Sequence, residues 1–292
     1  MKYNDEWKDY EVIATGDGMK LERWAKYILL RPDPQVIWKT DVDMMRYKGL
    51  SAYYMRSNTG GGAWHYVNNK EIGEFTVSWR NLKFKLKLMG FKHTGLFPEQ
   101  AVNWATMIDL IKNADRPIKV LNMFAYTGGA TVACMSAGAH VTHVDSAKAM
   151  IDRAKENIAL SGLDNTKVRF ILDDCKKFIQ KEIRRGNKYD AVIMDPPSFG
   201  RGPNGEKWKI EDEIYSLVAM TKEVLSDNPL FFLINSYTTG LQPQVMKNIL
   251  NKILSNYNGY TYSYEVGLPT KEKGVILPAG ASGLWSKEEI DE

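Results

Sequence analysis

The chain has 292 residues, of which 44% are hydrophobic and 25% charged, and its formal net charge is +4. This length allows two domains with a full hydrophobic core, and the mildly basic balance is compatible with nucleic acid without indicating it. The two cysteines exclude a disulfide framework and a zinc site of four cysteines. The polar N-terminus predicts no signal peptide, and no apolar run reaches the roughly 18 residues of a membrane helix, so we expect a cytoplasmic protein.

Residues 10–92 show short strand-like runs separated by turns. Residues 10–15 are predicted as a strand, and residues 20–30 as a second strand or a mixed segment. Pro32 and Pro34 end this segment, because proline fixes its own backbone and restricts the residue before it. The region therefore predicts a small N-terminal domain of its own.

A strand over residues 82–88 is predicted by the strict alternation of basic and apolar residues. One face would carry Lys83, Lys85 and Lys87, and the other would carry four apolar side chains. Basic side chains beside aromatic ones can hold RNA phosphates and stack bases. A solvated outer face of the domain explains the same pattern, so both interpretations stay open at this point.

The second part of the chain alternates helices and strands. Residues 101–113 are predicted as a helix, because apolar residues recur at helical spacing after Pro98. Three apolar strands, at 120–124, 141–144 and 191–194, then alternate with helical segments. This is the pattern of an α/β fold with a mostly parallel, doubly wound sheet. In such sheets ligands bind at the carboxyl ends of the strands.

The strands of this region end at glycine-rich or acidic corners. The first runs into Ala-Tyr-Thr-Gly-Gly, where paired glycines let backbone amides approach a ligand. The second ends at Asp145, whose carboxylate can accept both hydroxyls of a ribose. A further strand over residues 168–172 leads to Asp174 and Cys175, where a carboxylate can take the amino group of an adenine. Together the corners predict a site for an adenosine.

The kind of adenosine ligand follows from two loops. The first corner lacks the G-x-G-x-x-G sequence that admits the pyrophosphate of nicotinamide or flavin cofactors. The last strand ends at Asp-Pro-Pro-Ser. The motifs F-A-Y-T-G-G, V-D-S, D-D-C and M-D-P-P-S-F resemble those of class I S-adenosylmethionine-dependent methyltransferases, and more narrowly those of bacterial 23S ribosomal RNA methyltransferases of the RlmI and RlmK type. The resemblance extends over residues 94–285.

This resemblance implies a Rossmann-like domain over residues 93–292, with a mostly parallel sheet of seven strands, after a small N-terminal α/β domain over residues 1–92 that helps to form the RNA groove. It implies S-adenosylmethionine as cofactor and RNA, specifically 23S ribosomal RNA, as partner, with no membrane and no metal; a homo-oligomer stays open. The residues expected to bind the cofactor are Phe97, Gln100, Asn122, Phe124, Ala125, Tyr126, Thr127, Gly128, Gly129, Asp145, Ser146, Asp174, Cys175 and Asp195.

The Asp-Pro-Pro corner is the expected acceptor site, and its predicted catalytic residues are Asp195, Pro196, Pro197 and Phe199. The Asp195 carboxylate and the Pro196 carbonyl can accept N–H groups of a base, and the prolines keep these acceptors aimed. Phe199 can stack on a flipped base. A simple loop cap is the alternative interpretation of Asp195.

The rest of the domain is expected to follow the same fold. Residues 199–208 are glycine-rich and are interpreted as a mobile lid over the substrate. A helix over 211–226 and a buried strand over 230–234 come next, and two late strands are expected at 261–266 and 274–285. The late pair suits the antiparallel end of a methyltransferase sheet.

A cytosine-5 reaction would need a cysteine thiolate. In the RlmI branch this cysteine follows the fifth strand, but Tyr237 stands there in this chain, and Cys175 lies at the adenine side. We therefore expect no cytosine-5 chemistry of the usual kind. The main hypothesis is methylation of a ribosomal RNA base nitrogen, such as that of guanine. Methylation of a protein or a small molecule by the same fold is the alternative, and RNA binding without catalysis is a third possibility.

Overall fold

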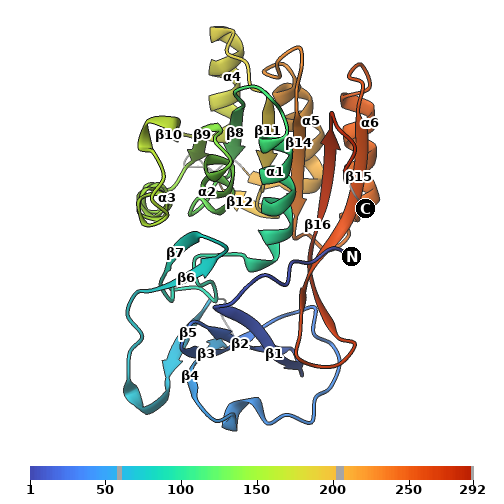
Figure 1. The fold of residues 1–292 in the computed structure, drawn as a ribbon. Helices are drawn as coiled ribbons and strands as arrows, with labels where there is room; N and C mark the ends of the chain where they lie inside the picture. The colour runs from blue at the N-terminus through green and yellow to red at the C-terminus, as the bar shows by residue number, and fades with distance from the viewer. Residues whose placement is uncertain (58–60, 202–206, 291–292) are drawn as a thin grey trace. The chain divides into compact units, whose positions relative to one another are not determined.

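A computed structural model describes residues 1–57, 61–201 and 207–290 (Figure 1). The chain divides into two compact units. The larger unit holds residues 1–2, 102–266 and 280–292, and the smaller holds residues 3–101 and 267–279. The smaller unit has a second segment, residues 267–279, far along the chain. A single boundary, such as the expected one after residue 92, would leave this segment outside the smaller unit. Within the described residues, no helix is both long and apolar enough to cross a bilayer.

The larger unit is built on a seven-stranded sheet in the order β10-β9-β8-β11-β14-β16-β15. The first five of these strands run parallel, and β16 is antiparallel to β14. The order reverses between β8 and β11, which is where ligands bind in doubly wound sheets. The predicted Rossmann-like architecture is therefore confirmed. The strands are β8 (Lys119–Met123), β9 (His140–Asp145), β10 (Val168–Leu172), β11 (Ala191–Met194), β14 (Phe231–Ser236), β15 (Tyr260–Pro269) and β16 (Ile276–Ser286).

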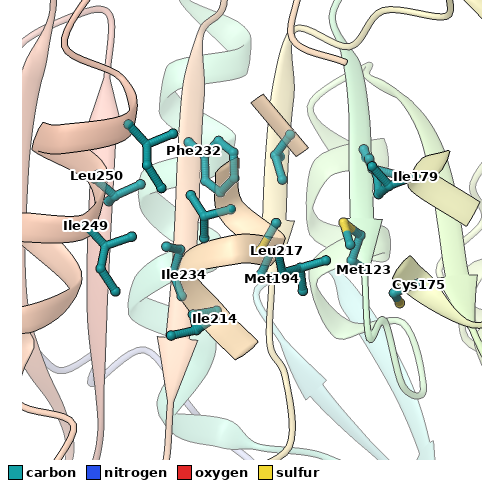
Figure 2. Packing of buried hydrophobic residues seen from close by; sticks show 14 of the residues in the cluster. Met123, Cys175, Ile179, Met194, Ile214, Leu217, Phe232, Ile234, Ile249 and Leu250 are labelled. Atoms are coloured by element: carbon teal, nitrogen blue, oxygen red, sulfur yellow. The ribbon is translucent and has the colours of Figure 1, made fainter. Parts of the chain in front are cut away.

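Helices cover both faces of this sheet. Figure 2 shows the buried cluster on one face, where Met123, Met194 and Ile234 of three strands pack against side chains of α4, α5 and α6. On the other face, Asn103 of α1 donates to Asn235 of β14 at 3.1 Å. The helices of this unit are α1 (Ala101–Lys112), α2 (Gly129–Ser136), α3 (Lys148–Leu160), α4 (Cys175–Arg185), α5 (Ile210–Lys222) and α6 (Pro243–Ile253), with the 3-10 turn η4 (Asn165–Lys167).

Strand β14 shows why the sheet has a single register. Its residues are all buried, because apolar side chains fill one face and the polar Asn235 is hydrogen-bonded on the other. A one-residue slip would place Asn235 in the apolar cluster and Ile234 among polar groups. Truncating Phe232 to alanine would cost about 3 to 5 kcal/mol, as for other fully buried aromatics.

The smaller unit is a β domain. Strands β1 (Tyr10–Gly16), β2 (Met19–Trp24), β3 (Tyr27–Pro32), β4 (Leu50–Arg56) and β5 (Gly62–Tyr66) form one sheet in chain order, and β6 (Phe75–Trp79) pairs with β7 (Leu82–Leu86). Its 3-10 turns are η1 (Met44–Arg46), η2 (Val67–Asn69) and η3 (Pro98–Gln100). The described residues before Ala101 contain no α-helix, so the expected α/β character of this domain is corrected. The resemblance supplied that expectation, whereas the local sequence has the short alternating runs of strands.

Residues 20–30 form two strands and not one. A two-residue turn at Ala25 and Lys26 joins β2 to β3, so that Trp24 pairs with Tyr27. Ala25 has a φ of 50°, a left-handed conformation that neither alanine nor lysine signals in a sequence. Its N–H donates to the carbonyl of Asp9 at 2.6 Å, which helps to hold the turn. The contact with Asp9 therefore stabilises a turn that the local sequence does not predict.

Candidate active site

The acidic and glycine-rich corners of the larger unit lie at one edge of its sheet. In register, Met123 of β8 lies beside Val144 of β9 and beside Met194 of β11, and Leu172 of β10 lies beside Asp145. All four strands are parallel, so the segments that follow them emerge at the same edge. This brings together the loop after β8, Asp145, the start of α4 and Asp195, as the sequence predicted.

The loop after β8 has an unusual backbone. Phe124, Tyr126 and Gly128 have φ angles of 55°, 50° and 84°, so alternate residues are left-handed. Such alternation can aim successive N–H groups at an anion, but here those of Phe124, Ala125, Tyr126 and Gly128 donate to acceptors of the protein itself. The N–H of Ala125 donates back to Val144 at 3.1 Å, and that of Gly128 to Ala125 at 3.0 Å. The conformation is therefore fixed from β9 and from within the loop.

The two glycines of this loop are required by packing. A Cβ on Gly128 would lie 2.8 Å from the Cβ of Ala154 in α3, and one on Gly129 would lie 2.6 Å from Cζ2 of Trp104 in α1. Any side chain at these positions would push the loop away from its helices. Glycine at these positions is predicted to let a ligand approach the backbone, and the close packing against α3 and α1 is a separate reason for its presence.

Asp145 links the end of β9 to the loop. Its Oδ2 accepts the N–H of Tyr126 at 2.8 Å, and its Oδ1 accepts the N–H of Ala147 at 2.8 Å. Burial raises the pKa of this carboxyl, and the backbone donors, including that of Ser146, offset the rise only in part. A carboxylate has about four lone-pair sites, so both oxygens can still accept hydroxyl groups of a ligand.

Some predicted cofactor residues support the loop from below. The Asn122 amide donates to Thr131 at 2.9 Å, and the Thr131 hydroxyl shares a hydrogen bond of 2.9 Å with Nδ1 of His143. Burial lowers the pKa of His143 to about 3, so the ring is neutral. Thr127 is buried as well, and its carbonyl accepts from Asn157 at 2.8 Å. Asn122 and Thr127 therefore have their side chains in the interior.

The start of α4 forms the adenine-side corner. Asp174 caps the helix by accepting the N–H of Lys177 at 2.9 Å, and it remains exposed. Asp173 forms an ion pair with Lys181 at 2.5 Å. Cys175 is buried, and its sulfur accepts the N–H of Phe124 at 3.3 Å. Burial raises the pKa of this thiol, so Cys175 is a neutral bridge between the loop and α4.

The Asp-Pro-Pro-Ser corner is held from three directions. The N–H of Asp195 donates to Met123 at 3.4 Å, which joins the corner to β8. The indole of Trp208 donates to the carbonyl of Pro197 at 2.6 Å. The hydroxyl of Thr238, just after β14, donates to that of Ser198 at 2.6 Å. Of the predicted catalytic residues, Pro196 is buried, Asp195 is half-buried, and Pro197 and Phe199 are exposed.

The segment after this corner is a short hairpin in its described part. Strands β12 (Phe199–Arg201) and β13 (Lys207–Lys209) pair antiparallel, with Phe199 opposite Lys209. The predicted lid was a loop without regular structure, so that expectation is corrected over the strands, while residues 202–206 lie outside the described part. Cross-strand pairing formed these strands, because three-residue runs around Gly200 carry little strand signal.

Trp208 is the functional candidate that the sequence argument missed. Besides its bond to Pro197, its ring lies 5.7 Å from that of Phe124, so one side chain contacts the acceptor corner and the loop after β8. A tryptophan inside a polar, glycine-rich stretch was the available signal, since such a residue needs an apolar contact. Phe97 and Gln100 belong to the smaller unit, and their role at the cofactor stays a prediction.

The sheet order and the corners at its switch point define a class I S-adenosylmethionine-dependent methyltransferase. The model of the S-adenosylmethionine-dependent methyltransferase family matches residues 47–219, more than half of the chain. The chain belongs to this family. A solved S-adenosylmethionine-dependent methyltransferase from Agrobacterium tumefaciens superposes with a TM-score of 0.90 and 33% identity, over 98% of this chain and 92% of that one. The predicted family, activity and cofactor are thus confirmed.

Curated relatives extend the comparison. The ribosomal RNA large subunit methyltransferase K/L of Shewanella oneidensis is 33% identical over 77% of this chain and 30% of its own length. The ribosomal RNA large subunit methyltransferase I of Klebsiella pneumoniae (strain 342) is 34% identical over 58% of this chain and 40% of its own length. The chain thus spans less than half of the length of these relatives. The tRNA m1G37 methyltransferase of M. jannaschii, with a TM-score of 0.55 and 14% identity, shares the fold alone.

Proposed function

We propose that this methyltransferase acts on a base in RNA, with large-subunit ribosomal RNA as the expected substrate. The observation that carries the proposal is the adjacency of β8 and β11, which sets the cofactor loop beside the rigid Asp-Pro-Pro-Ser corner. The relatives named as large-subunit ribosomal RNA methyltransferases support the choice of substrate.

The residues of the site fit S-adenosylmethionine. The half-buried Asp145 offers acceptor positions for ribose hydroxyls, and the exposed Asp174 retains one carboxylate oxygen beyond its helix cap for an adenine amino group. Directly after the loop that follows β8, the start of α2 at Gly129 offers the positive end of a helix, which suits the carboxylate of a methionine moiety. When bound, this cofactor supplies a methyl group on a positively charged sulfur.

The Asp-Pro-Pro-Ser corner after β11 would bind the base that accepts the methyl group. Asp195 and the Pro196 carbonyl would accept the two N–H groups of an exocyclic amino group of the base, and this would orient its nitrogen toward the methyl donor. The Asp195 carboxylate would take the proton that this nitrogen loses when it is methylated. Phe199, which is 57% exposed, would stack on the target base after the base has flipped out of the RNA helix. Alignment of this kind is the main need of a methyl transfer, since the reaction requires no covalent help from the protein.

Transfer of tritium from labelled S-adenosylmethionine tests the substrate. Ribosomal RNA, total protein and a small-molecule extract are offered separately, and label should enter the large-subunit RNA. Nucleoside mass spectrometry of the product then identifies the base. If label enters only the protein or only the small-molecule extract, the RNA proposal is wrong, and the alternative of protein or small-molecule methylation by the same fold replaces it.

A pair of variants tests the acceptor corner. Asp195→Asn should lower the rate constant for methyl transfer by about 100-fold or more, in the range seen when one positioned polar group is lost. Its affinity for S-adenosylhomocysteine tests the second expected role of Asp195, at the cofactor, and a loss of less than about threefold would limit Asp195 to the acceptor. Asp190→Asn, at the opposite end of β11, is the matched control and should leave the rate unchanged. Equal rates for Asp195→Asn and the control would reject the role of Asp195.

A further inference from the structure

The smaller unit carries a group of basic side chains on one face of its five-stranded sheet. Lys20 of β2 pairs directly across from Arg31 of β3, so these two like charges point to the same face. Ala52 pairs with Leu29, which places Arg56 of β4 on that face too. Lys92 approaches from the segment after β7, where its carbonyl accepts from Arg31 at 2.9 Å. Like charges opposite each other in a sheet are destabilising unless something compensates them.

Arg31 is compensated inside the protein. Its guanidinium makes two hydrogen bonds to the fully buried Glu22, at 2.6 and 2.8 Å, and lies over the ring of Trp24. The hydroxyl of Tyr10 adds a bond of 2.8 Å to the same carboxylate, and the buried Glu99 also acts on Arg31. Arg31 therefore has a structural role, because its charge is paired with Glu22. It acts on the other basic side chains only through the remaining electrostatic repulsion.

Lys92 is not compensated in this way. Its ammonium has one hydrogen bond in the described part of the chain, at 3.4 Å to the carbonyl of Pro32, although it has three donors to place. Burial lowers the pKa of Lys92, and Lys20, Arg31 and Arg56 lower it further against the opposing effect of Asp33. The Asp33 carboxylate already forms an ion pair of 3.1 Å with Lys20, which also lies 3.8 Å from the Glu22 carboxylate. The half-buried ammonium is thus held among cations with too few anions.

The segment that carries Lys92 is fixed in place. The N–H of Lys87 donates to Thr94 at 3.2 Å, and the N–H of Met89 donates to His93 at 3.3 Å. Burial first, and then the cations Arg31, Lys92 and Lys20, lower the pKa of His93 to about 4, so the imidazole is neutral at neutral pH. A rigid segment that holds a cation against like charges is the arrangement expected where an anion is to bind.

We propose that Lys20, Arg56 and Lys92 form a binding site for a phosphate group of the RNA backbone. Arg56 is exposed at the end of β4 and has no ion pair in the described part of the chain, so its guanidinium can donate two parallel hydrogen bonds to the oxygens of a phosphate. Asp33 and Glu22 are already paired with Lys20 and Arg31, and a phosphate would supply negative charge for Lys92 and Arg56. The proposal rests on RNA as the substrate, and it assigns to this unit the task of holding the strand by its backbone and not by its sequence.

The test is fluorescence anisotropy with labelled oligouridylate, measured over a series of salt concentrations. The double variant Lys92→Gln/Arg56→Gln should bind about tenfold more weakly at low salt. The slope of log K against log salt should become shallower by about 0.7 for each cation removed. The control Lys48→Gln/Lys273→Gln has the same net charge and changes exposed lysines of the same unit, and it should stay within about twofold of the wild type.

A stability measurement separates a binding role from a structural one. Lys92→Gln removes a charge that its neighbours disfavour, so its thermal midpoint should equal or exceed that of the wild type while RNA affinity falls. A lower midpoint together with weaker binding would show that Lys92 only supports the fold, and would overturn the proposal. Binding of the double variant equal to that of the lysine control would overturn it as well.

Competition identifies the source of the anion. Unlabelled oligouridylate should displace the probe from the wild type, whereas polyglutamate or inorganic phosphate at the same charge concentration should not. Equal displacement by polyglutamate would overturn the choice of RNA. Methylation of RNA by the double variant at the wild-type efficiency would reject this site alone, whereas a wild type that methylates no RNA would reject the proposed function itself.

Discussion

The carboxylate of Asp145 accepts the backbone N–H of Tyr126 at 2.8 Å, and this bond connects the end of β9 to the left-handed loop that follows β8. The same carboxylate accepts from Ala147 at the entrance to α3. One side chain therefore sets the position of two segments that border the cofactor site. Holding an ionised carboxylate here costs free energy, which is reflected in the raised pKa of Asp145. Burial disfavours the ionised form more than the backbone donors favour it.

Asp145→Asn should separate binding from stability. The pKa of Asp145 is higher in the folded than in the unfolded chain, so the folded state binds the proton more tightly, and the ionised carboxylate costs stability above that pKa. At neutral pH the melting temperature of the variant should stay close to that of the wild type, because relief of this cost opposes the loss of one of the two backbone hydrogen bonds, since asparagine has a single acceptor oxygen. Its affinity for S-adenosylhomocysteine should fall at least tenfold, since hydrogen bonds to a charged group contribute about 1.5 to 3 kcal/mol.

Isothermal titration calorimetry and a melting curve check this pair of outcomes. Asp152→Asn is the control, because Asp152 is a half-buried residue of α3, one helix turn beyond the site, whose carboxylate forms ion pairs with Lys148 and Lys155. Its affinity should change by less than about twofold. An Asp145→Asn protein that melts lower and binds normally would make Asp145 a structural residue.

Loss of the Trp208 indole N–H should lower the rate of methyl transfer more than the affinity for the cofactor. Trp208→Phe keeps an aromatic ring near Phe124 and removes the 2.6 Å bond to Pro197. The rate constant for methyl transfer should fall about five- to tenfold, as expected for one hydrogen bond of roughly 1 kcal/mol. Trp208→Ala should also weaken cofactor binding, because the contact with the loop is lost. Single-turnover kinetics and calorimetry distinguish these effects, and equal losses of binding in both variants would argue against a role at the corner.

Much of the larger unit could be predicted because its signals are local. Apolar strands that end at glycine or aspartate gave the positions of β8, β9 and β11, and parallel pairing then placed their ends at one edge. The acidic residue Asp145 at the end of β9 predicts a binding corner, and its contact with the cofactor stays a prediction. These signals depend only on residue type and spacing, so no long-range information was needed.

Other features depended on contacts between distant residues. The buried position of Asn122 follows from Thr131 and His143, and nothing beside Asn122 in the sequence distinguishes an inward amide from one that faces a ligand. The β12–β13 hairpin forms through pairing across residues that have weak strand propensity. The basic group around Lys92 joins residues that are 36 and 72 positions away in sequence, at Arg56 and Lys20, so only the fold could reveal it.

The cysteines should be unreactive in the folded protein. Cys134 and Cys175 are both buried, and burial raises the pKa of each thiol, so neither supplies a thiolate near neutral pH. A thiol reagent such as Ellman's reagent should label both only after denaturation. RNA containing 5-azacytosine should form no covalent adduct, and the reaction product should contain no 5-methylcytosine. A stable adduct, or fast labelling of Cys175 in the native state, would contradict the expectation that cytosine-5 chemistry is absent.

The Glu22–Arg31 pair should make the smaller unit sensitive to acid. Although burial raises the pKa of Glu22, Arg31, Lys20 and the Tyr10 hydroxyl lower it from its ordinary 4.5 to about 2. The stabilisation is therefore present above pH 4.5 and is lost as the pH falls toward 2, with a size of about 3 kcal/mol for a depression of this extent.

Urea denaturation between pH 7 and pH 2 checks this dependence through two variants. Glu22→Gln leaves Arg31 buried without its carboxylate, so it should be less stable than the wild type by about 3 to 5 kcal/mol at pH 7. This difference should narrow as the pH drops from 4.5 toward 2, because the wild type then loses the same charge. Tyr10→Phe removes only the hydroxyl that donates to Glu22, so it should cost about 1 kcal/mol with little narrowing above pH 4.5. A constant difference for Glu22→Gln down to pH 2 would mean that Glu22 keeps its charge, or never carries one, throughout the range.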